Sequence, residues 1–183
     1  ATETQFDQRD VQANATIISG DLNDNDDPND FTYSSLLRAD NSFRILEVLA
    51  NDVELNGITI TGGNANNTSN IEGSAIYMSS TYTGLTIRNC EFSYNVCNRN
   101  GALHLDHGGG GDSKSLTIEH SVFHHNLGRY SGAIQVILGN GNATLDFNLN
   151  NNLFYSNIAR DLDNGDAGWS GSSVSVLSNN GAI

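Results

Sequence analysis

The hydrophobic positions of this chain repeat with a period of about 31 residues, and such a period is typical of solenoid proteins. Three segments read alike at offsets of 31 residues, namely 85–96, 116–127 and 147–158, and a fourth copy, 53–64, precedes them by 32. Within each segment apolar residues alternate with polar ones, which is the pattern of a strand with one buried face. The repeat therefore predicts coils in which equivalent strands stack on one another.

A second strand follows in each coil. Its copies begin at Ser74, Gly101, Gly132 and Ser172, and their apolar residues again alternate with polar ones. By this alternation, one side of the strand is buried and the other faces solvent. The residues expected to face solvent are Tyr77, His104, Gln135 and Ser175.

Two columns of identical residues follow from aligning the coils. One column consists of phenylalanines, which would stack ring on ring, and the other of asparagines, which would form a hydrogen-bonded ladder at a turn. The columns are Phe92, Phe123 and Phe154, followed three residues later by Asn95, Asn126 and Asn157. The alternative for the asparagines is the ordinary preference of this residue for turns.

The pattern predicts an all-β protein, a right-handed parallel β-helix of about five coils, the first and last incomplete. It is expected to form one domain over residues 1–183, without clear end caps. Two loop insertions interrupt the repeat, an acidic one at 21–41 and a second one at 158–171.

The repeat resembles that of polymorphic outer-membrane proteins and related bacterial β-helical surface proteins, which carry F-x-x-N and G-G-A-[ILV] motifs. The first motif stands here at Phe92–Asn95, Phe123–Asn126 and Phe154–Asn157, and the second, with one of its two glycines, at Asn100–Leu103 and Ser131–Ile134. The resemblance implies a right-handed parallel β-helix exposed outside a bacterial cell, often in adhesion.

Charge narrows the choice of partners. The formal net charge of −13 disfavours nucleic acid and anionic membrane surfaces, because both carry negative charge. No run of about 18 apolar residues is present, so membrane insertion is not expected.

The acidic insertion contains a candidate calcium site. Oxygen-bearing residues alternate there as at the start of an EF-hand loop, at Asp21, Asn23, Asn25, Asp27 and Asn29. The central glycine of such a loop is missing, so a solvated acidic loop is the alternative. Calcium is the only cofactor that the sequence suggests.

The cysteines and histidines leave alternatives open. Cys90 and Cys97, seven residues apart, are either a local disulfide of an oxidising compartment or two buried thiols. All five histidines lie between residues 104 and 125, where a metal site competes with ordinary surface histidines.

The sequence favours an extracellular structural or adhesive protein of a bacterial surface. Because both ends of the chain read as uncapped strand sequence, it predicts either a fragment of a longer solenoid or head-to-tail assembly of copies, which we favour. No catalytic residue is assigned. The rival class is a polysaccharide-binding or polysaccharide-cleaving β-helix, and the outward aromatic residues suited to surface glycans are Tyr77, Tyr94, Tyr155 and Trp169.

Overall fold

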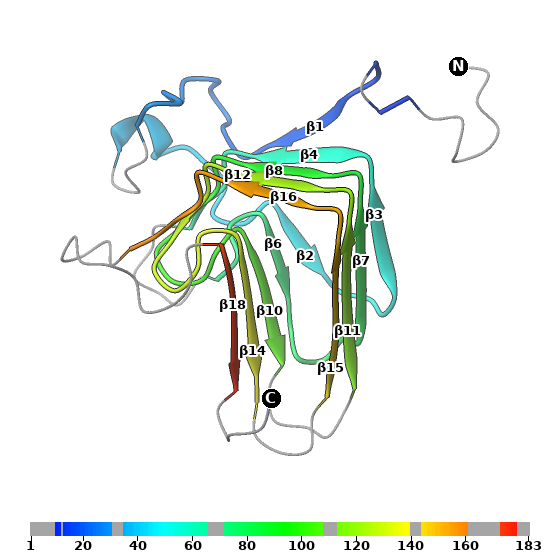
Figure 1. Cartoon of the computed structure of the whole chain (residues 1–183). Helices are drawn as coiled ribbons and strands as arrows, with labels where there is room; N and C mark the ends of the chain where they lie inside the picture. The colour runs from blue at the N-terminus through cyan, green and yellow to red at the C-terminus, as the bar shows by residue number, and fades with distance from the viewer. Residues whose placement is uncertain are drawn as a thin grey trace.

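The chain winds into a parallel β-solenoid with almost no helix (Figure 1). The computed structural model describes residues 10–11, 13–30, 35–65, 72–107, 113–139, 144–160 and 173–178. Residue 12, both ends of the chain and most of the second insertion (158–171), including Trp169, lie outside these ranges. Strands from successive turns pair in parallel to form four sheets, which we name A to D.

Sheets A and B each contain five strands. In spatial order, sheet A consists of β1 (Thr16–Ser19), β4 (Ile58–Thr61), β8 (Glu91–Ser93), β12 (Val122–His124) and β16 (Leu153–Tyr155). Sheet B consists of β2 (Leu46–Val48), β6 (Ile76–Met78), β10 (Leu103–His107), β14 (Ile134–Leu138) and β18 (Val174–Ser178).

Sheets C and D each contain four strands. Sheet C consists of β3 (Val53–Asn56), β7 (Gly84–Arg88), β11 (Lys114–Glu119) and β15 (Leu145–Asn150). Sheet D consists of the two-residue strands β5 (Asn64–Ala65), β9 (Val96–Cys97), β13 (Leu127–Gly128) and β17 (Ile158–Ala159). We call one strand from each sheet in chain order, such as β11 to β14, a rung.

The solenoid has about three turns, so the prediction of about five coils was too high. The first part of the chain explains the difference, because among the described residues it supplies strands to sheets A and B only. The parallel β-helical fold itself is confirmed.

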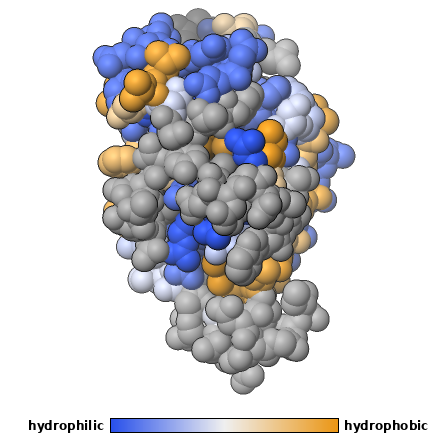
Figure 2. Space-filling model, turned by 90° about the vertical axis from the view of Figure 1, so that its left-hand side faces the viewer, coloured by the Kyte–Doolittle hydropathy of each residue, from blue (hydrophilic) through white to orange (hydrophobic). Residues whose placement is uncertain are grey.

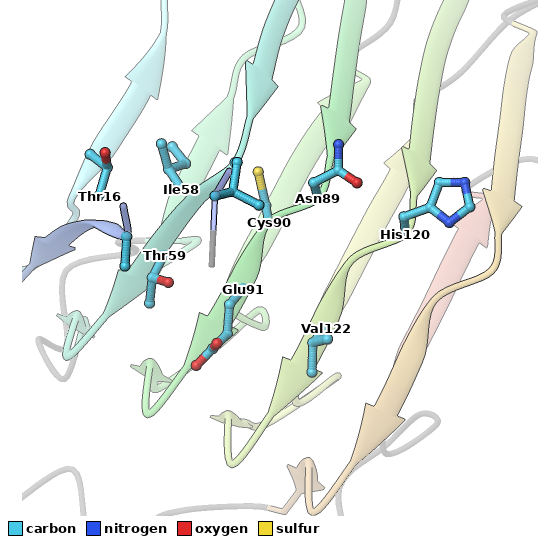
Figure 3. A pocket seen from close by; sticks show the side chains of 11 residues that line it. Thr16, Ile58, Thr59, Asn89, Cys90, Glu91, His120 and Val122 are labelled. Atoms are coloured by element: carbon cyan, nitrogen blue, oxygen red, sulfur yellow. The ribbon is translucent and has the colours of Figure 1, made fainter. Parts of the chain in front are cut away.

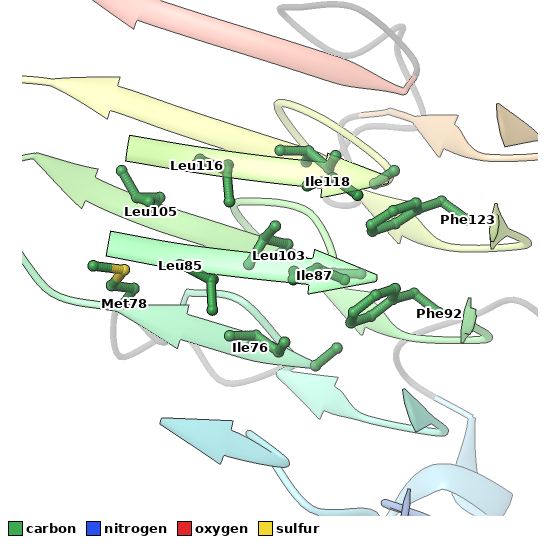
Figure 4. Close-up of a cluster of buried hydrophobic side chains, with 14 of the residues drawn as sticks. Ile76, Met78, Leu85, Ile87, Phe92, Leu103, Leu105, Leu116, Ile118 and Phe123 are labelled. Atoms are coloured by element: carbon green, nitrogen blue, oxygen red, sulfur yellow. The ribbon is translucent and has the colours of Figure 1, made fainter. Parts of the chain in front are cut away.

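Equivalent apolar residues stack in the interior, as the 31-residue repeat predicted (Figure 4). Phe92 and Phe123 are fully buried, with ring centroids 4.5 Å apart, and Phe154 continues the stack 5.1 Å from Phe123. The aliphatic residues of β7 and β11 form neighbouring columns of the same core. Each fully buried side chain of this size contributes roughly 1.5–3 kcal/mol through burial.

The asparagines form a hydrogen-bonded ladder at the corner between sheets A and D. Asn126 Nδ2 donates to Asn157 Oδ1 and to Phe92 O, both at 2.9 Å. The Oδ1 of Asn126 accepts from both the backbone N and the Nδ2 of Asn95, each at 3.1 Å. These bonds satisfy backbone groups that the corner removes from water, so the column is more than a turn preference.

The acidic insertion folds back against the corner at which the strands of sheet A end. Arg38, at the end of the short 3-10 helix η2 (Leu36–Arg38), is 2% exposed and donates from Nη1 to the backbone oxygen of Tyr94 at 3.0 Å. Asn41 donates to Gly62 O at 2.7 Å. Figure 2 views the molecule from this side and shows hydrophilic surface in its upper part. Within the described ranges, no helix is long and apolar enough to cross a bilayer.

Candidate functional site

The outer side of sheet A ends at a corner that projects polar and aromatic side chains. Tyr94, His125 and Ser156 occupy equivalent corner positions with φ of 55°, 52° and 52°. A left-handed residue other than glycine is strained by roughly 1–2 kcal/mol. The asparagine that follows each of these residues holds the corner through the ladder, so the strained turn is repeated in every rung.

Four rings gather at this corner, and we call them the His–Tyr row. Tyr94 stacks on His125 with centroids 5.2 Å apart, and His124 stacks on Tyr155 at 4.9 Å. The two stacks meet edge to face, with 5.1 Å between the centroids of His124 and His125. The row is open to solvent at Tyr155, which is 42% exposed.

A carboxylate joins the row and orders its two imidazoles. Glu91 Oε1 lies 3.1 Å from His124 Nε2, and His124 Nδ1 lies 2.8 Å from His125 Nδ1. Because a carboxylate only accepts, His124 is assigned a proton on Nε2, and in the contact between the two Nδ1 atoms one ring donates and the other accepts. Burial, together with the charge of His124, lowers the pKa of His125 below its ordinary value.

A groove of about 420 Å³ lies at the other end of the sheet A strands, near the corner between sheets C and A (Figure 3). It crosses from rung to rung, because Thr59, Glu91 and Val122 are successive partners on β4, β8 and β12. The lining residues are Val11, Ala15, Thr16, Gly57, Ile58, Thr59, Asn89, Cys90, Glu91, His120 and Val122. Glu91 therefore belongs both to the groove and to the carboxylate–imidazole chain.

A smaller pocket of about 190 Å³ lies where the acidic insertion meets Tyr94. Its lining includes Asp21, Asp24, Asp26 and Arg38. Burial raises the pKa of Asp26, even though a hydrogen bond from Asn41 and the charge of Arg38 act in the opposite direction. The pocket is thus lined by carboxylates and by one buried positive charge, the guanidinium of Arg38.

The five residues of the candidate calcium site are spread along this insertion. The two carboxylate oxygens of Asp21 accept backbone N–H groups of Asn25 and Asp26 at 3.3 and 3.0 Å. Asp27 Oδ1 accepts from Asn29, and the backbone N of Asn23 donates to Asp40. Among the residues that the structure describes, no three His, Cys, Asp or Glu side chains form a metal-binding group. Calcium binding stays a prediction.

The outer side of sheet B is covered, contrary to the expectation that it faces solvent. His104 and Gln135 are fully buried, and Ser175 is 6% exposed. The segment before β6 lies over this side: Glu72 Oε2 is 3.0 Å from His104 Nε2, and a Cβ at Gly73 would be 3.0 Å from His104 Cβ. On sheet B the polar residues of the alternating pattern therefore form a second buried layer, on the side of the sheet opposite to the apolar core.

Charged and aromatic groups fill that layer. The guanidinium of Arg44 lies 4.1 Å from the centroid of the Tyr77 ring, and that ring stacks on His104 at 5.7 Å. Glu72 contacts His104 and forms an ion pair with Arg99 at 3.6 Å. Burial by itself raises the pKa of Glu72, but the contact with His104 and the charges of His104 and Arg99 hold it below its ordinary value.

Cys90 and Cys97 are both buried and are not joined by a disulfide in the structure, which corresponds to the alternative of two buried thiols. Cys90 lies at the corner between sheets C and A, where its Sγ is 3.0 Å from Arg88 O. Cys97 lies in β9 of sheet D. Burial raises the pKa of both thiols above the ordinary value, which keeps them protonated.

Fold and site together define the class of the protein: a parallel β-solenoid with one open, groove-bearing outer face and one covered outer face. No protein-family model matches the chain, and neither a curated protein nor a solved structure matches it significantly.

Proposed function

We propose that the chain is an extracellular structural and adhesive module of a bacterial surface, extended head-to-tail by further copies. The observation that carries this proposal is the exposure of the last rung. Ile87 and Ile118 are fully buried, whereas Leu149, one rung later in the same column, is 37% exposed. Val96 and Leu127 are also fully buried, whereas Ile158 in their column is 40% exposed. Burying these residues needs another rung.

The strand edges support a copy of the same chain as that rung. Within the described residues, β15 to β18 are the edge strands of the four sheets at one end, and β1, β2, β3 and β5 are the edge strands at the other. Stacking one end on the other would continue sheets A and B in parallel through β1 and β2, and would leave a gap of one strand in sheets C and D before β3 and β5. Such a contact joins two different surfaces, so it repeats without closing and produces a filament.

The surface location rests on two further points. The three F-x-x-N copies resemble repeats of bacterial β-helical surface proteins. The net charge of −13 favours a soluble, well-hydrated exterior that does not adhere to nucleic acid. Adhesion then requires a recognition surface, and the open outer face of sheet A supplies one.

Electron microscopy combined with light scattering over a concentration series tests the assembly. We expect the wild-type chain to form filaments whose length grows with concentration. Leu149→Lys, which places a charge on the exposed end column, is expected to remain monomeric. Asn148→Lys on the same strand, where the side chain is already exposed, is the matched control and is expected to form filaments. Circular dichroism checks that both variants fold. Wild-type protein that stays monomeric throughout the series contradicts the proposal.

A further inference from the structure

We infer that the outer face of sheet A binds a neutral glycan chain, laid obliquely across the rungs from the groove to the His–Tyr row. This inference rests on the adhesive part of the proposed function and names the chemical class of its partner. The monomeric chain is sufficient for this binding, whereas head-to-tail assembly would place the next copy beside the free face of the Tyr155 ring.

The groove has the size and composition of a carbohydrate site. Its volume of about 420 Å³ falls within the range of sites for small molecules. Glu91 and Thr59 can accept hydrogen bonds from sugar hydroxyl groups, and Asn89 and His120 can both donate and accept hydrogen bonds. Val122 and Ile58 add apolar surface, which suits the C–H face of a pyranose ring.

The periodicity of the face matches that of a polymer. The outward residues Thr59, Glu91 and Val122 are partners on three successive strands, β4, β8 and β12, and all three line the groove. Paired strands are spaced by roughly 4.8 Å. A pyranose unit in an extended chain has nearly this length, so successive units meet successive rungs.

The His–Tyr row continues the groove. Glu91 connects the two through its 3.1 Å contact with His124. His124 packs against one face of the Tyr155 ring, and this tyrosine is 42% exposed. Stacking of a sugar on an ordered aromatic ring loses little entropy, because the ring is already held by its neighbour.

Charge selects among glycans. The lining of the groove contains the carboxylate of Glu91 and no lysine or arginine. The whole chain carries a net charge of −13. Uronate or sulfated chains are therefore repelled, and neutral chains are favoured.

Affinity electrophoresis in gels that contain a soluble polysaccharide tests the inference. The neutral probes are hydroxyethyl cellulose, galactomannan and arabinoxylan, and polygalacturonate is the anionic probe. We expect retardation by at least one neutral probe and none by polygalacturonate. Glu91→Gln and Tyr155→Ala are each expected to weaken binding by about tenfold or more, the loss typical of a charged hydrogen bond or an aromatic contact.

Two variants on another face are matched controls. Glu47→Gln changes a carboxylate whose side chain is 45% exposed, as is that of Glu91, and Phe43→Ala removes an aromatic side chain that is 50% exposed. Both are expected to bind as the wild type does. No retardation by any neutral probe, stronger retardation by polygalacturonate, or equal losses in the controls would overturn the inference.

The same gels run with Leu149→Lys separate the two proposals. If this variant is retarded and the wild type forms no filaments, head-to-tail assembly is contradicted and the glycan site is supported. Filaments without retardation by any neutral probe contradict the glycan site and support the assembly.

Discussion

The outer faces of sheets A and B have the same alternating sequence pattern and opposite environments. On sheet A the outward column is open: the Glu91 side chain is 45% exposed and Leu153 is 54% exposed. On sheet B the equivalent column is closed at β10 and β14, where His104 and Gln135 are fully buried, and is open only towards β2, where the Glu47 side chain is 45% exposed. Both columns flank one core and belong to the same rungs.

The difference arises from the path of the chain between strands. Before β6 the chain doubles back over sheet B, where Glu72 contacts His104 and where the backbone oxygen of Glu72 accepts two hydrogen bonds from Arg44. The polar column of sheet B thus contacts and holds in place the segment that precedes β6. The polar column of sheet A remains open to solvent, so the same sequence pattern holds a covering segment on one side and leaves an accessible surface on the other.

The largest contrast is expected from placing the same charge on both faces of one rung. Gln135→Lys buries an ammonium group without a counter-charge and should lower the free energy of unfolding by roughly 3–5 kcal/mol. Val122→Lys, on the open face of the same rung, should change it by about 0.5 kcal/mol or less. Urea denaturation of the two variants measures the contrast, and equal losses would refute it.

Removing the charge of Glu72 should have a smaller effect that depends on pH. Glu72→Gln is expected to lower the free energy of unfolding by about 1–3 kcal/mol at pH 7, the usual contribution of a hydrogen-bonded charge. Folding lowers the pKa of Glu72 from its ordinary value of 4.5, so the ionised side chain stabilises the fold above that pH. This contribution is lost as the pH falls through the lower, folded pKa.

The wild type and Glu72→Gln should therefore converge in stability as the pH is lowered from 5 towards 3. Urea titrations at several pH values measure the convergence. Glu91→Gln is the control on the open face, with an expected change of about 0.5 kcal/mol or less at pH 7. A gap between the wild type and Glu72→Gln that widens on acidification would show that this carboxylate does not stabilise the covered layer.

The smallest effect is expected to be a gain in stability. Both the Nε2 and the Oε1 atoms of Gln135 are buried and make no hydrogen bond to the part of the chain that the structure describes. Gln135→Met keeps the shape of the side chain and removes the two unsatisfied atoms, so it should stabilise the protein by about 1 kcal/mol. Thermal unfolding measures the change, and a loss of stability would mean that the amide is needed where it lies.

The sequence predicted the core and the corner because those positions repeat. Phe92 and Phe123 stack, and Asn95 bonds Asn126, since the offset of 31 residues places like residues over one another. The strands of sheet D were not anticipated. A strand of two residues, such as β9, is too short to display an alternating pattern.

The segment that covers the outer side of sheet B was not predicted. An alternating pattern distinguishes the two sides of a strand, but it does not show whether another segment packs against the polar side. A signal was present in the glycines. A Cβ at Gly63 would lie 2.4 Å from Ser74 O, and a Cβ at Gly73 would lie 3.0 Å from His104 Cβ. Backbone that approaches so closely tolerates no side chain, so glycines near the second strand indicate a chain that folds over itself.

The candidate site was predicted only in part. The outward aromatic residues Tyr94 and Tyr155 were recognised, but their association with His124 and His125 depends on the left-handed corner, which residue types alone do not reveal. The burial of Arg38 was likewise not foreseen, because an arginine within an acidic loop usually faces solvent.

Disulfide trapping between rungs tests the stacking register most directly. Thr86 and Thr117 are partners on adjacent strands, and Asn148 is one rung further on. Neighbouring strands lie within the Cα separation that a disulfide allows, whereas two rungs exceed it. We expect Thr86→Cys/Thr117→Cys to cross-link rapidly on mild oxidation and Thr86→Cys/Asn148→Cys not to cross-link. Cross-linking of the second pair with none of the first would contradict the stacking of residues 31 apart.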